Sequence, residues 1–202
     1  MNPCARVEAP ALLVKHGADI TIKYIKKRLE NPVYKFQWPI REKQSLRTIV
    51  ANSLRGMTQG RCSYCDGYPI ESVGVEHIDH FKPKSVFPEL VCEWANLFLS
   101  CSKCNTKKNA NWDEKNIPLR PDEPGYSFFR YFDYNVETGE LIPNNLASSE
   151  EQNKAKATIE IFNLNRAGAR TNRKKEAWLM KHNATYENWA YRFLLPLFGE
   201  ES

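Results

Sequence analysis

Four of the six cysteines form two closely spaced pairs, Cys62-x-x-Cys65 and Cys101-x-x-Cys104. A gap of two residues lets one tight turn present both sulfurs to one ion, and four thiolates complete a closed tetrahedral zinc site. A closed site has no position for a substrate, so we predict a structural Zn²⁺ held by these four residues. The pairs do not lie in a strand–helix–strand context, which argues against a thioredoxin-like redox function.

The 35 residues between Cys65 and Cys101 contain the tetrapeptide His77-Ile78-Asp79-His80. A carboxylate suits a second, harder metal, and an imidazole with an ordinary pKa near 6.5 can take a proton from water at neutral pH. An acid and a base enclosed by a zinc site, beside a run of lysines, predict phosphodiester cleavage. The alternative is a zinc finger with an inactive site that only binds nucleic acid or serves as a scaffold.

Three segments of this region together resemble the HNH nuclease motif of the ββα-metal superfamily. They are Asp79-His80-Phe81-x-Pro83-x-Ser85, Asn96-Leu97 and Cys101-x-x-Cys104-Asn105-x-x-Lys108. Further segments resemble one subgroup, the PtuB-type HNH subunits of Septu and some retron-associated antiphage systems. These are Arg6-x-x-Ala9-Pro10, Glu89-x-x-x-x-Trp94-x-Asn96-Leu97, and Phe162-x-Leu164-Asn165-Arg166 with Arg170 and Arg173.

The resemblance implies a role for each motif residue. Asp79 would bind a catalytic divalent metal, His80 would be the general base, and Asn96 would hold the segment through backbone hydrogen bonds. Asn105 stands where many members have a metal-binding histidine, and its amide oxygen favours Mg²⁺ or Mn²⁺ over a catalytic Zn²⁺. The role of His77 stays open, and the alternatives are a further metal ligand, a phosphate contact and a packing residue.

Four lysines flank the expected site, namely Lys82, Lys84, Lys107 and Lys108. As phosphate contacts they would be insensitive to sequence and sensitive to salt. Lys108 is the strongest candidate because it falls inside the motif, and the alternative for each lysine is a solvated side chain. HNH chemistry needs no 2′-hydroxyl, so DNA is the expected substrate, with RNA such as tRNA as the alternative.

The subgroup resemblance also implies partners. It implies an SMC/ABC-like ATPase of the PtuA type that controls the nuclease, and in some systems a retron reverse transcriptase with its msDNA. In that setting we expect the flanking helices to carry the partner contacts. The arginines near the end, Arg166, Arg170 and Arg173, recur at helical spacing and indicate either a nucleic-acid-binding face or a solvated one.

Composition is consistent with a folded protein that has an anionic partner. The 202 residues carry a net charge of +5, with 42% hydrophobic and 12% aromatic residues, enough for a packed core. No apolar run approaches the roughly 18–20 residues of a membrane span, and the N-terminus has no apolar signal core. We therefore expect a cytoplasmic protein with no membrane partner, where paired cysteines bind metal rather than form disulfides.

These patterns predict an α+β fold, a zinc-stapled ββα finger with N- and C-terminal helical extensions and a small β-hairpin. We expect an N-terminal helical extension over 1–56, the HNH nuclease core over 57–115, and a hairpin with a C-terminal helical region over 116–202, all in one compact body. Apolar spacing predicts helices over about 20–30, 41–54, 148–163 and 168–193, an extended segment over 33–39, and strands over 126–132 and 140–142.

Overall fold

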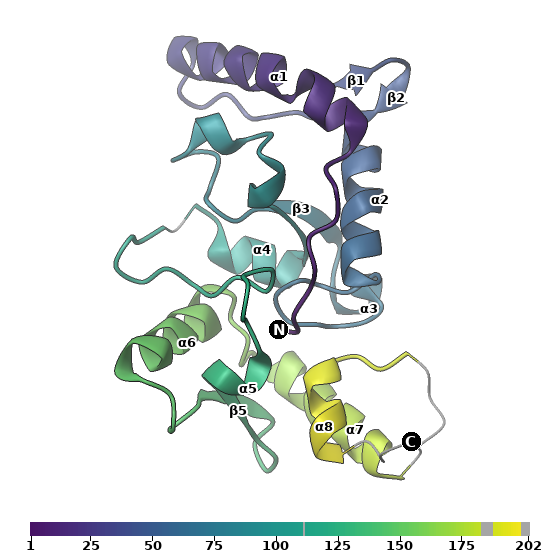
Figure 1. Cartoon of the computed structure of the whole chain (residues 1–202), viewed down its shortest axis with the longest axis vertical. Helices are drawn as coiled ribbons and strands as arrows, with labels where there is room; N and C mark the ends of the chain where they lie inside the picture. The colour runs from purple at the N-terminus through teal and green to yellow at the C-terminus, as the bar shows by residue number, and fades with distance from the viewer. Residues whose placement is uncertain (111, 183–187, 199–202) are drawn as a thin grey trace.

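The chain folds as predicted into an α+β structure of helices and two-stranded antiparallel sheets (Figure 1). The computed structural model describes residues 1–110, 112–182 and 188–198. The helices are α1 (Ala11–Glu30), α2 (Leu46–Thr58), α3 (Ile70–Val73), α4 (Ser102–Lys108), α5 (Phe128–Tyr131), α6 (Ser149–Ile161), α7 (Ala167–His182) and α8 (Leu195–Phe198). The strands are β1 (Ile40–Arg41), β2 (Gln44–Ser45), β3 (Glu76–His80), β4 (Leu97–Cys101), β5 (Phe132–Asn135) and β6 (Glu140–Pro143). Short 3₁₀ helices cover Pro88–Leu90, Trp94–Asn96 and Arg192–Leu194.

A ββα unit lies at the centre of the fold. β3 pairs antiparallel with β4 in a register that places Glu76 opposite Cys101 and His80 opposite Leu97. β4 is buried at every residue, in agreement with its nearly continuous apolar sequence, whereas β3 carries the polar residues. α4 follows β4 without a loop, because Cys101 ends the strand and is also the N-cap residue of the helix. The predicted finger is therefore present.

α1 lies across one end of the molecule, and α2 runs from there along the finger (Figure 1). The first helix begins at Ala11, earlier than the predicted start near residue 20. Pro10 immediately precedes the helix, where the missing N–H of proline costs nothing, and Gly17 faces Cys92 so closely that an added Cβ would lie 3.4 Å from the Cys92 Cβ. α2 begins later than predicted because the short β1–β2 hairpin precedes it, and the Ser45 hydroxyl then caps the helix at the Thr48 N–H.

Residues 31–39 form an extended arm that returns from α1 toward the finger. The arm contains no strand residues, but it alternates as the sequence predicts: Tyr34, Phe36 and Trp38 are half-buried, and the residues between them are exposed. The ring centroids of Phe36 and Trp38 are 5.0 Å apart, and Phe36 also contacts Tyr24 of α1 at 5.3 Å. Aromatic packing thus replaces strand pairing in holding the arm.

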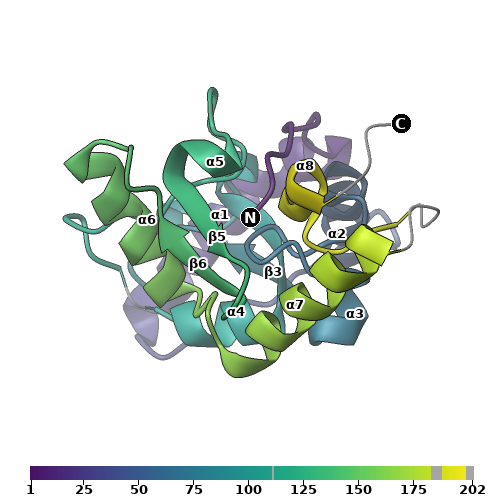
Figure 2. The same ribbon diagram turned by 90° about the horizontal axis from the view of Figure 1, so that it is seen from below.

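The C-terminal half supplies the predicted hairpin and helices with shifted boundaries. Residues predicted to begin the first hairpin strand instead form the short helix α5, in which Phe128 and Tyr131 both point into the core. The β5–β6 hairpin follows and lies between α6 and α7 (Figure 2). The predicted capping box at the start of α6 is present, with Ser148 and Glu151 each binding the other's backbone N–H.

The predicted last helix ends at His182 instead of Phe193. Residues 183–187 lie outside the described residues, and Tyr191 adopts a left-handed conformation with φ 54° that no helix continues through. The Tyr191 N–H donates to the Asp66 carbonyl at 2.9 Å, and the ring of Phe193 stacks on Phe128 at 4.1 Å. These tertiary contacts outweigh the helical spacing of the local sequence.

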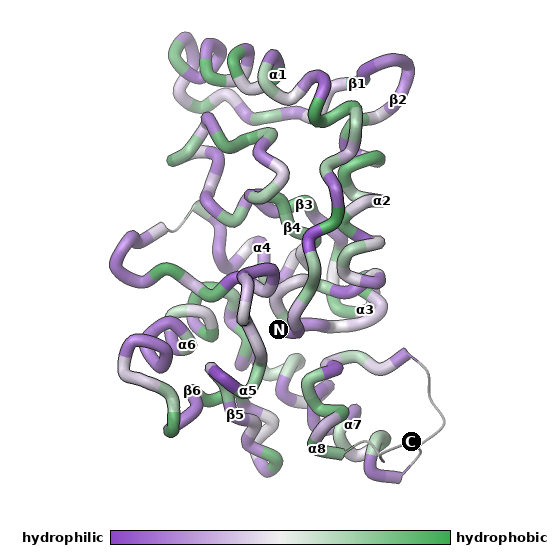
Figure 3. The backbone as a smooth tube through the Cα atoms, viewed as in Figure 1, coloured by the Kyte–Doolittle hydropathy of each residue, from purple (hydrophilic) through white to green (hydrophobic). Residues whose placement is uncertain are grey.

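One hydrophobic cluster joins all parts of the described chain. It contains Leu13 and Leu54 from the N-terminal segment, Phe98 from the finger, and Phe162 and Leu194 from the C-terminal segment. In Figure 3 the apolar colouring of the finger lies along β4, whereas β3 is mostly hydrophilic. The flanking segments therefore pack on the finger and fix its two ends.

Within the described residues, no helix is both long and apolar enough to cross a membrane.

Candidate metal centre and active site

The four paired cysteines converge as the spacing predicts. Their sulfur atoms all lie within 4.8 Å of one another, all four side chains are buried, and none forms a disulfide. The Cys65 and Cys101 sulfurs are 4.0 Å apart, close to the edge of about 3.8 Å that a tetrahedron with Zn–S bonds of about 2.3 Å requires. The donor set and its geometry therefore fit a closed zinc site.

Two elements present the thiols. Cys62 and Cys65 lie on the turn between α2 and α3, where the Asp66 N–H donates to the Cys62 carbonyl at 2.9 Å. Cys101 ends β4 and Cys104 lies in the first turn of α4. A metal at this point joins the α2–α3 turn to the junction of β4 and α4, so it holds α4 in place against the sheet.

Arg166 lies beside this cluster, contrary to the expectation of a nucleic-acid-binding or solvated arginine face. Its guanidinium is 3.7 Å from the sulfurs of both Cys65 and Cys104. Burial lowers the pKa of Arg166, but the neighbouring Cys104 and Cys65 thiolates outweigh it and raise that pKa above its ordinary value. Arg170 pairs with Glu140 at 2.7 Å, and buried Arg173 donates to the Gly139 and Leu164 carbonyls. These arginines hold the fold together.

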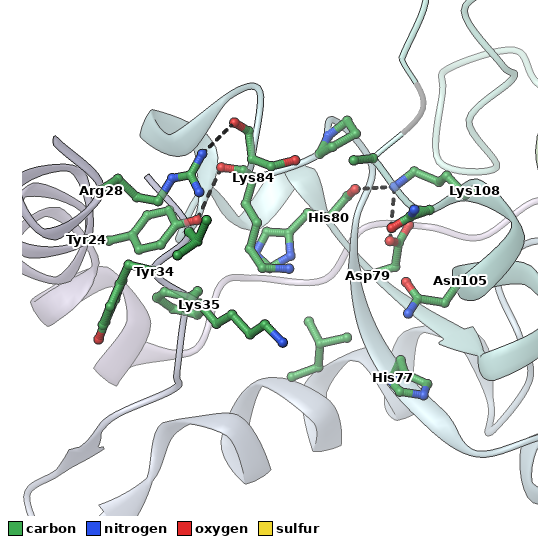
Figure 4. Close-up of a pocket in the computed structure, with 17 residues that line it drawn as sticks. Tyr24, Arg28, Tyr34, Lys35, His77, Asp79, His80, Lys84, Asn105 and Lys108 are labelled. Carbon is green, nitrogen blue, oxygen red and sulfur yellow. Dashed lines mark hydrogen bonds and ion pairs between the residues drawn. The ribbon is translucent and has the colours of Figure 1, made fainter. Parts of the chain in front are cut away.

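A cavity of about 540 Å³ lies between the finger and the N-terminal extension (Figure 4). Tyr24 and Arg28 of α1 and the arm residues Tyr34, Lys35 and Phe36 form one wall. The finger forms the other wall, with His77, Asp79 and His80 of β3, Lys84 of the following loop, and Asn105 and Lys108 of α4. The structure thus brings all the predicted catalytic residues except Asn96 to one cavity.

His80 is oriented as a proton acceptor. Its Nε2 lies 2.9 Å from the Val91 carbonyl oxygen, which can only accept, so Nε2 carries the hydrogen and Nδ1 keeps its lone pair. Nδ1 is buried and has no hydrogen-bond partner among the described residues. Burial, with smaller effects from Lys84 and Lys108, lowers the pKa of His80 to about 3. The imidazole is therefore neutral at physiological pH.

Two aromatic side chains of the arm fix the ring of His80. Trp38 is stacked on it with ring centroids 6.3 Å apart, and Phe36 meets it edge-on at 6.1 Å. The arm thus sets the orientation of the histidine in addition to forming the wall of the cavity.

Asp79 is buried and each of its oxygens accepts one hydrogen bond. The Tyr64 hydroxyl donates to Oδ2 at 2.6 Å, and the Lys108 ammonium donates to Oδ1 at 3.0 Å and to the His80 carbonyl at 2.5 Å. Burial and the adjacent carboxylate raise the pKa of Tyr64 well above its ordinary value, so the phenol stays protonated as the donor. These donors hold the carboxylate in one orientation, and each oxygen keeps a lone pair that accepts no hydrogen bond from them.

The residues around Asp79 fit a divalent metal that keeps most of its water. Apart from the four cysteines, the described part of the chain has no cluster of three or more His, Cys, Asp or Glu side chains that could hold a metal ion. Mg²⁺ is commonly bound by one or two protein oxygens, waters and substrate phosphates. Asp79 and the half-buried Asn105 can supply such oxygens, and His77 lies on the same strand face two residues before Asp79.

The four predicted lysines have different surroundings. Lys108 is 1% exposed and paired with Asp79, so its ammonium is not free to contact phosphate as the motif position suggested. Lys84 lines the cavity, where burial lowers its pKa. Lys82 lies over the rings of Phe87 and Trp112, and Lys107 is exposed away from the cavity lining.

Asn96 makes the backbone contacts that the resemblance implies. Its Oδ1 accepts from the Lys82 N–H at 2.8 Å, and its Nδ2 donates to the carbonyls of Lys82 at 3.0 Å and Leu90 at 3.3 Å. The side chain thereby fixes the loop after His80. It also holds the Leu90 carbonyl, one residue before Val91, whose own carbonyl lies opposite the His80 ring.

Tyr64, Trp38 and Lys35 belong to the site although no motif in the sequence indicates them. Tyr64 lies inside the first cysteine pair, and its ring packs on Phe162, with centroids 3.7 Å apart, and on Phe98 while its hydroxyl reaches Asp79. Trp38 and Lys35 belong to the arm, whose alternation was visible in the sequence. Nothing in that alternation says that the arm folds back over β3.

Residues 62–111 match a protein-family model described as HNH endonuclease. The chain is also similar to two curated proteins described as Septu protein PtuB. The one from Bacillus thuringiensis is 30% identical over 115 residues, which is 56% of this chain and 40% of the relative. The one from Bacillus mycoides (strain KBAB4) is 32% identical over 37% of this chain and 30% of the relative. The matches thus cover less than half the length of either relative.

Proposed function

We propose that this chain, which carries an HNH endonuclease domain, is a metal-dependent endonuclease that hydrolyses phosphodiester bonds. The observation that supports the proposal most strongly is the environment of His80. Its Nε2–H is bound to the Val91 carbonyl, so a neutral Nδ1 with a free lone pair lies in the same cavity as Asp79 and Asn105. A buried acceptor without a partner indicates a group that takes a proton during the reaction.

In this mechanism His80 is the general base. Nδ1 takes a proton from the attacking water, and the imidazolium that forms is stabilised by the Val91 carbonyl at Nε2. A positioned base of this kind contributes a rate factor on the order of 10²–10⁴. Trp38 and Phe36 keep the ring from rotating, and Asn96 keeps the loop that supplies the carbonyl in place.

Asp79 and Asn105 would hold a Mg²⁺ or Mn²⁺ ion. A bound divalent ion supplies Lewis-acid stabilisation of the charge that develops on the phosphate and the leaving oxygen. The protein supplies the orientation: Tyr64 and Lys108 hold the Asp79 carboxylate, and α4 presents Asn105 at the cavity. The zinc at the four cysteines holds α4 against β3 and takes no part in the reaction.

We infer that the protein acts in antiphage defence, which the similarity to Septu PtuB proteins supports. In this proposal it is the effector subunit of a complex, controlled by an SMC/ABC-like ATPase of the PtuA type, and in some systems accompanied by a retron reverse transcriptase and its msDNA. DNA is the expected substrate and RNA such as tRNA is the alternative. The complex would work in the cytoplasm.

The test is cleavage of labelled DNA and RNA by the zinc-loaded full chain, alone and with its ATPase partner. We expect cleavage when Mg²⁺ or Mn²⁺ is added and none without either ion. Cleavage that needs no added divalent ion would contradict the proposed site. Binding of nucleic acid with no cleavage under any of these conditions would favour the inactive zinc-finger module.

A further inference from the structure

We propose that the cavity between the arm and the finger is a binding subsite for a single, unpaired nucleic-acid strand. The proposal rests on the proposed endonuclease function and names the form of its substrate. It follows from the charge of the cavity, from the contacts that close it on the side of α1, and from its size.

The cavity has an excess of positive charge. Arg28, Lys35 and Lys84 line it, and Asp79 is its one lining carboxylate, already paired with Lys108. Among residues 1–110, 112–182 and 188–198, neither the Lys35 nor the Lys84 ammonium forms an ion pair, and the Asp79 carboxylate, which pairs with Lys108, attracts Lys84 only from a longer distance. Figure 4 shows the Lys35 side chain extending from the arm toward the opposite wall. Cations without acidic partners that face a cavity are suited to phosphate groups.

Two contacts fasten the N-terminal extension across the cavity. The Tyr24 hydroxyl donates to the Lys84 carbonyl at 3.4 Å, and Arg28 Nη2 donates to the Ser85 carbonyl at 3.3 Å. Both join α1 to the loop that follows β3, and the arm then continues to Trp38 against His80. The base and Asp79 are therefore reached through a slot with protein on both sides.

The volume of the slot is that of a site for a small ligand. Its volume of about 540 Å³ lies in the range of about 300–1,000 Å³ that is typical of small-molecule sites. That range fits a nucleotide or two of one strand, whereas a duplex would bring its second strand against α1 or the arm. Tyr34 is half-buried at the wall of the slot. Proteins bind single strands without reading their sequence by combining such an aromatic ring with neighbouring cations.

Binding to the full chain tests this inference separately from cleavage. Fluorescence anisotropy would be measured with zinc-loaded protein and no added Mg²⁺ or Mn²⁺. The probes are a short labelled DNA strand of mixed sequence, the RNA strand of the same sequence, and the DNA strand annealed to its complement. We expect either single strand to bind at least 5-fold more tightly than the duplex, because loss of one stacked base weakens binding by about 5- to 150-fold.

Variants identify the surface that binds. Lys35→Ala and Lys84→Ala should each reduce the slope of log K against log salt by about 0.7 for a single strand, the value for one phosphate contact. Lys26→Ala is the matched control, since Lys26 is exposed on α1 outside the cavity lining. Tyr34→Ala should weaken binding and Tyr34→Phe should restore it, which a general loss of stability would not produce.

Duplex binding as tight as single-strand binding, unchanged salt slopes for both lysine variants, or no binding of any probe would each overturn the subsite. A preference between the DNA and the RNA strand identifies the sugar, and either preference supports the subsite if the duplex binds more weakly. Single-strand binding without cleavage on addition of Mg²⁺ or Mn²⁺, both alone and with the ATPase partner, would leave the subsite standing and refute the proposed endonuclease function.

Discussion

Substitution of Lys108 by methionine tests the buried ion pair that Lys108 forms with Asp79 in the wall of the cavity. The Lys108 and Asp79 side chains are 1% and 5% exposed, and Nζ and Oδ1 are 3.0 Å apart. Removal of the ammonium leaves a buried carboxylate with only the Tyr64 hydroxyl as donor. Breaking one partner of a buried pair costs about 3–5 kcal/mol, so Lys108→Met should lower the free energy of unfolding by that amount.

Urea denaturation of zinc-loaded protein, followed by circular dichroism, measures this cost. Lys107→Met is the matched control, because Lys107 is the exposed neighbour on the same helix, and surface substitutions are usually within about 0.5 kcal/mol of neutral. The double variant with Asp79→Asn should recover much of the loss, because the neutral amide no longer needs a cation.

A double-mutant cycle gives the coupling between Lys108 and Asp79, and we expect it to exceed 1 kcal/mol, within the usual range of about 0.5–3 kcal/mol for residues in contact. Additive effects, or a Lys108→Met variant as stable as the Lys107→Met control, would refute the assignment of Lys108 as the counterion of Asp79. Lys108 would then be available for phosphate, as its position in the motif first suggested.

Three further predictions concern the zinc centre and the histidine. Cys101→Ser should lose zinc and unfold, because thiolate binding contributes to folding; metal analysis and circular dichroism check this, and a folded, zinc-free wild-type protein would contradict it. Arg166→Met should release zinc to a chromogenic chelator faster than wild type, because the guanidinium 3.7 Å from two sulfurs offsets their charge; an unchanged rate would show that the contact is only structural. For His80 the folded-state pKa is lowered to about 3, so below pH 6.5 the unfolded chain binds a proton that the folded chain does not, and the folded state loses stability as pH falls. Between pH 8 and 5 this costs about 2 kcal/mol. In urea titrations His80→Ala should therefore show a correspondingly smaller loss over that range than wild type, and equal losses would contradict the buried neutral histidine.

The sequence was sufficient for the parts of the site that are fixed by short spacings. The two-residue gaps between the cysteines are local features, and the four sulfurs converge as these gaps predict. The ββα finger that the motif implies is formed by β3, β4 and α4. The capping box at Ser148 and Glu151 is local in the same sense. Asn96 was placed through the resemblance, and its hydrogen bonds agree with it.

The remaining features depend on contacts between residues distant in sequence. Arg166 contacts the sulfurs of Cys104 and Cys65, which precede it by 62 and 101 residues. Trp38 reaches His80 only because the arm turns back from α1 over β3. Lys108 looked like a phosphate ligand because the sequence does not show that its helix buries it against Asp79. The segment around Tyr191 has helical spacing, yet its backbone N–H forms a hydrogen bond with the distant Asp66 carbonyl instead of a helical partner.

The most direct test of the proposed activity is single-turnover cleavage in Mn²⁺ or Mg²⁺ by zinc-loaded wild-type protein and His80→Ala, each with its partner where the partner is required. His16→Ala is the control, because His16 lies on α1 beside Glu42 and outside the cavity lining. We predict that His80→Ala cleaves on the order of 10²–10⁴-fold more slowly with its zinc content unchanged, and that His16→Ala cleaves like wild type. Equal rates for His80→Ala and wild type would show that His80 is not the base.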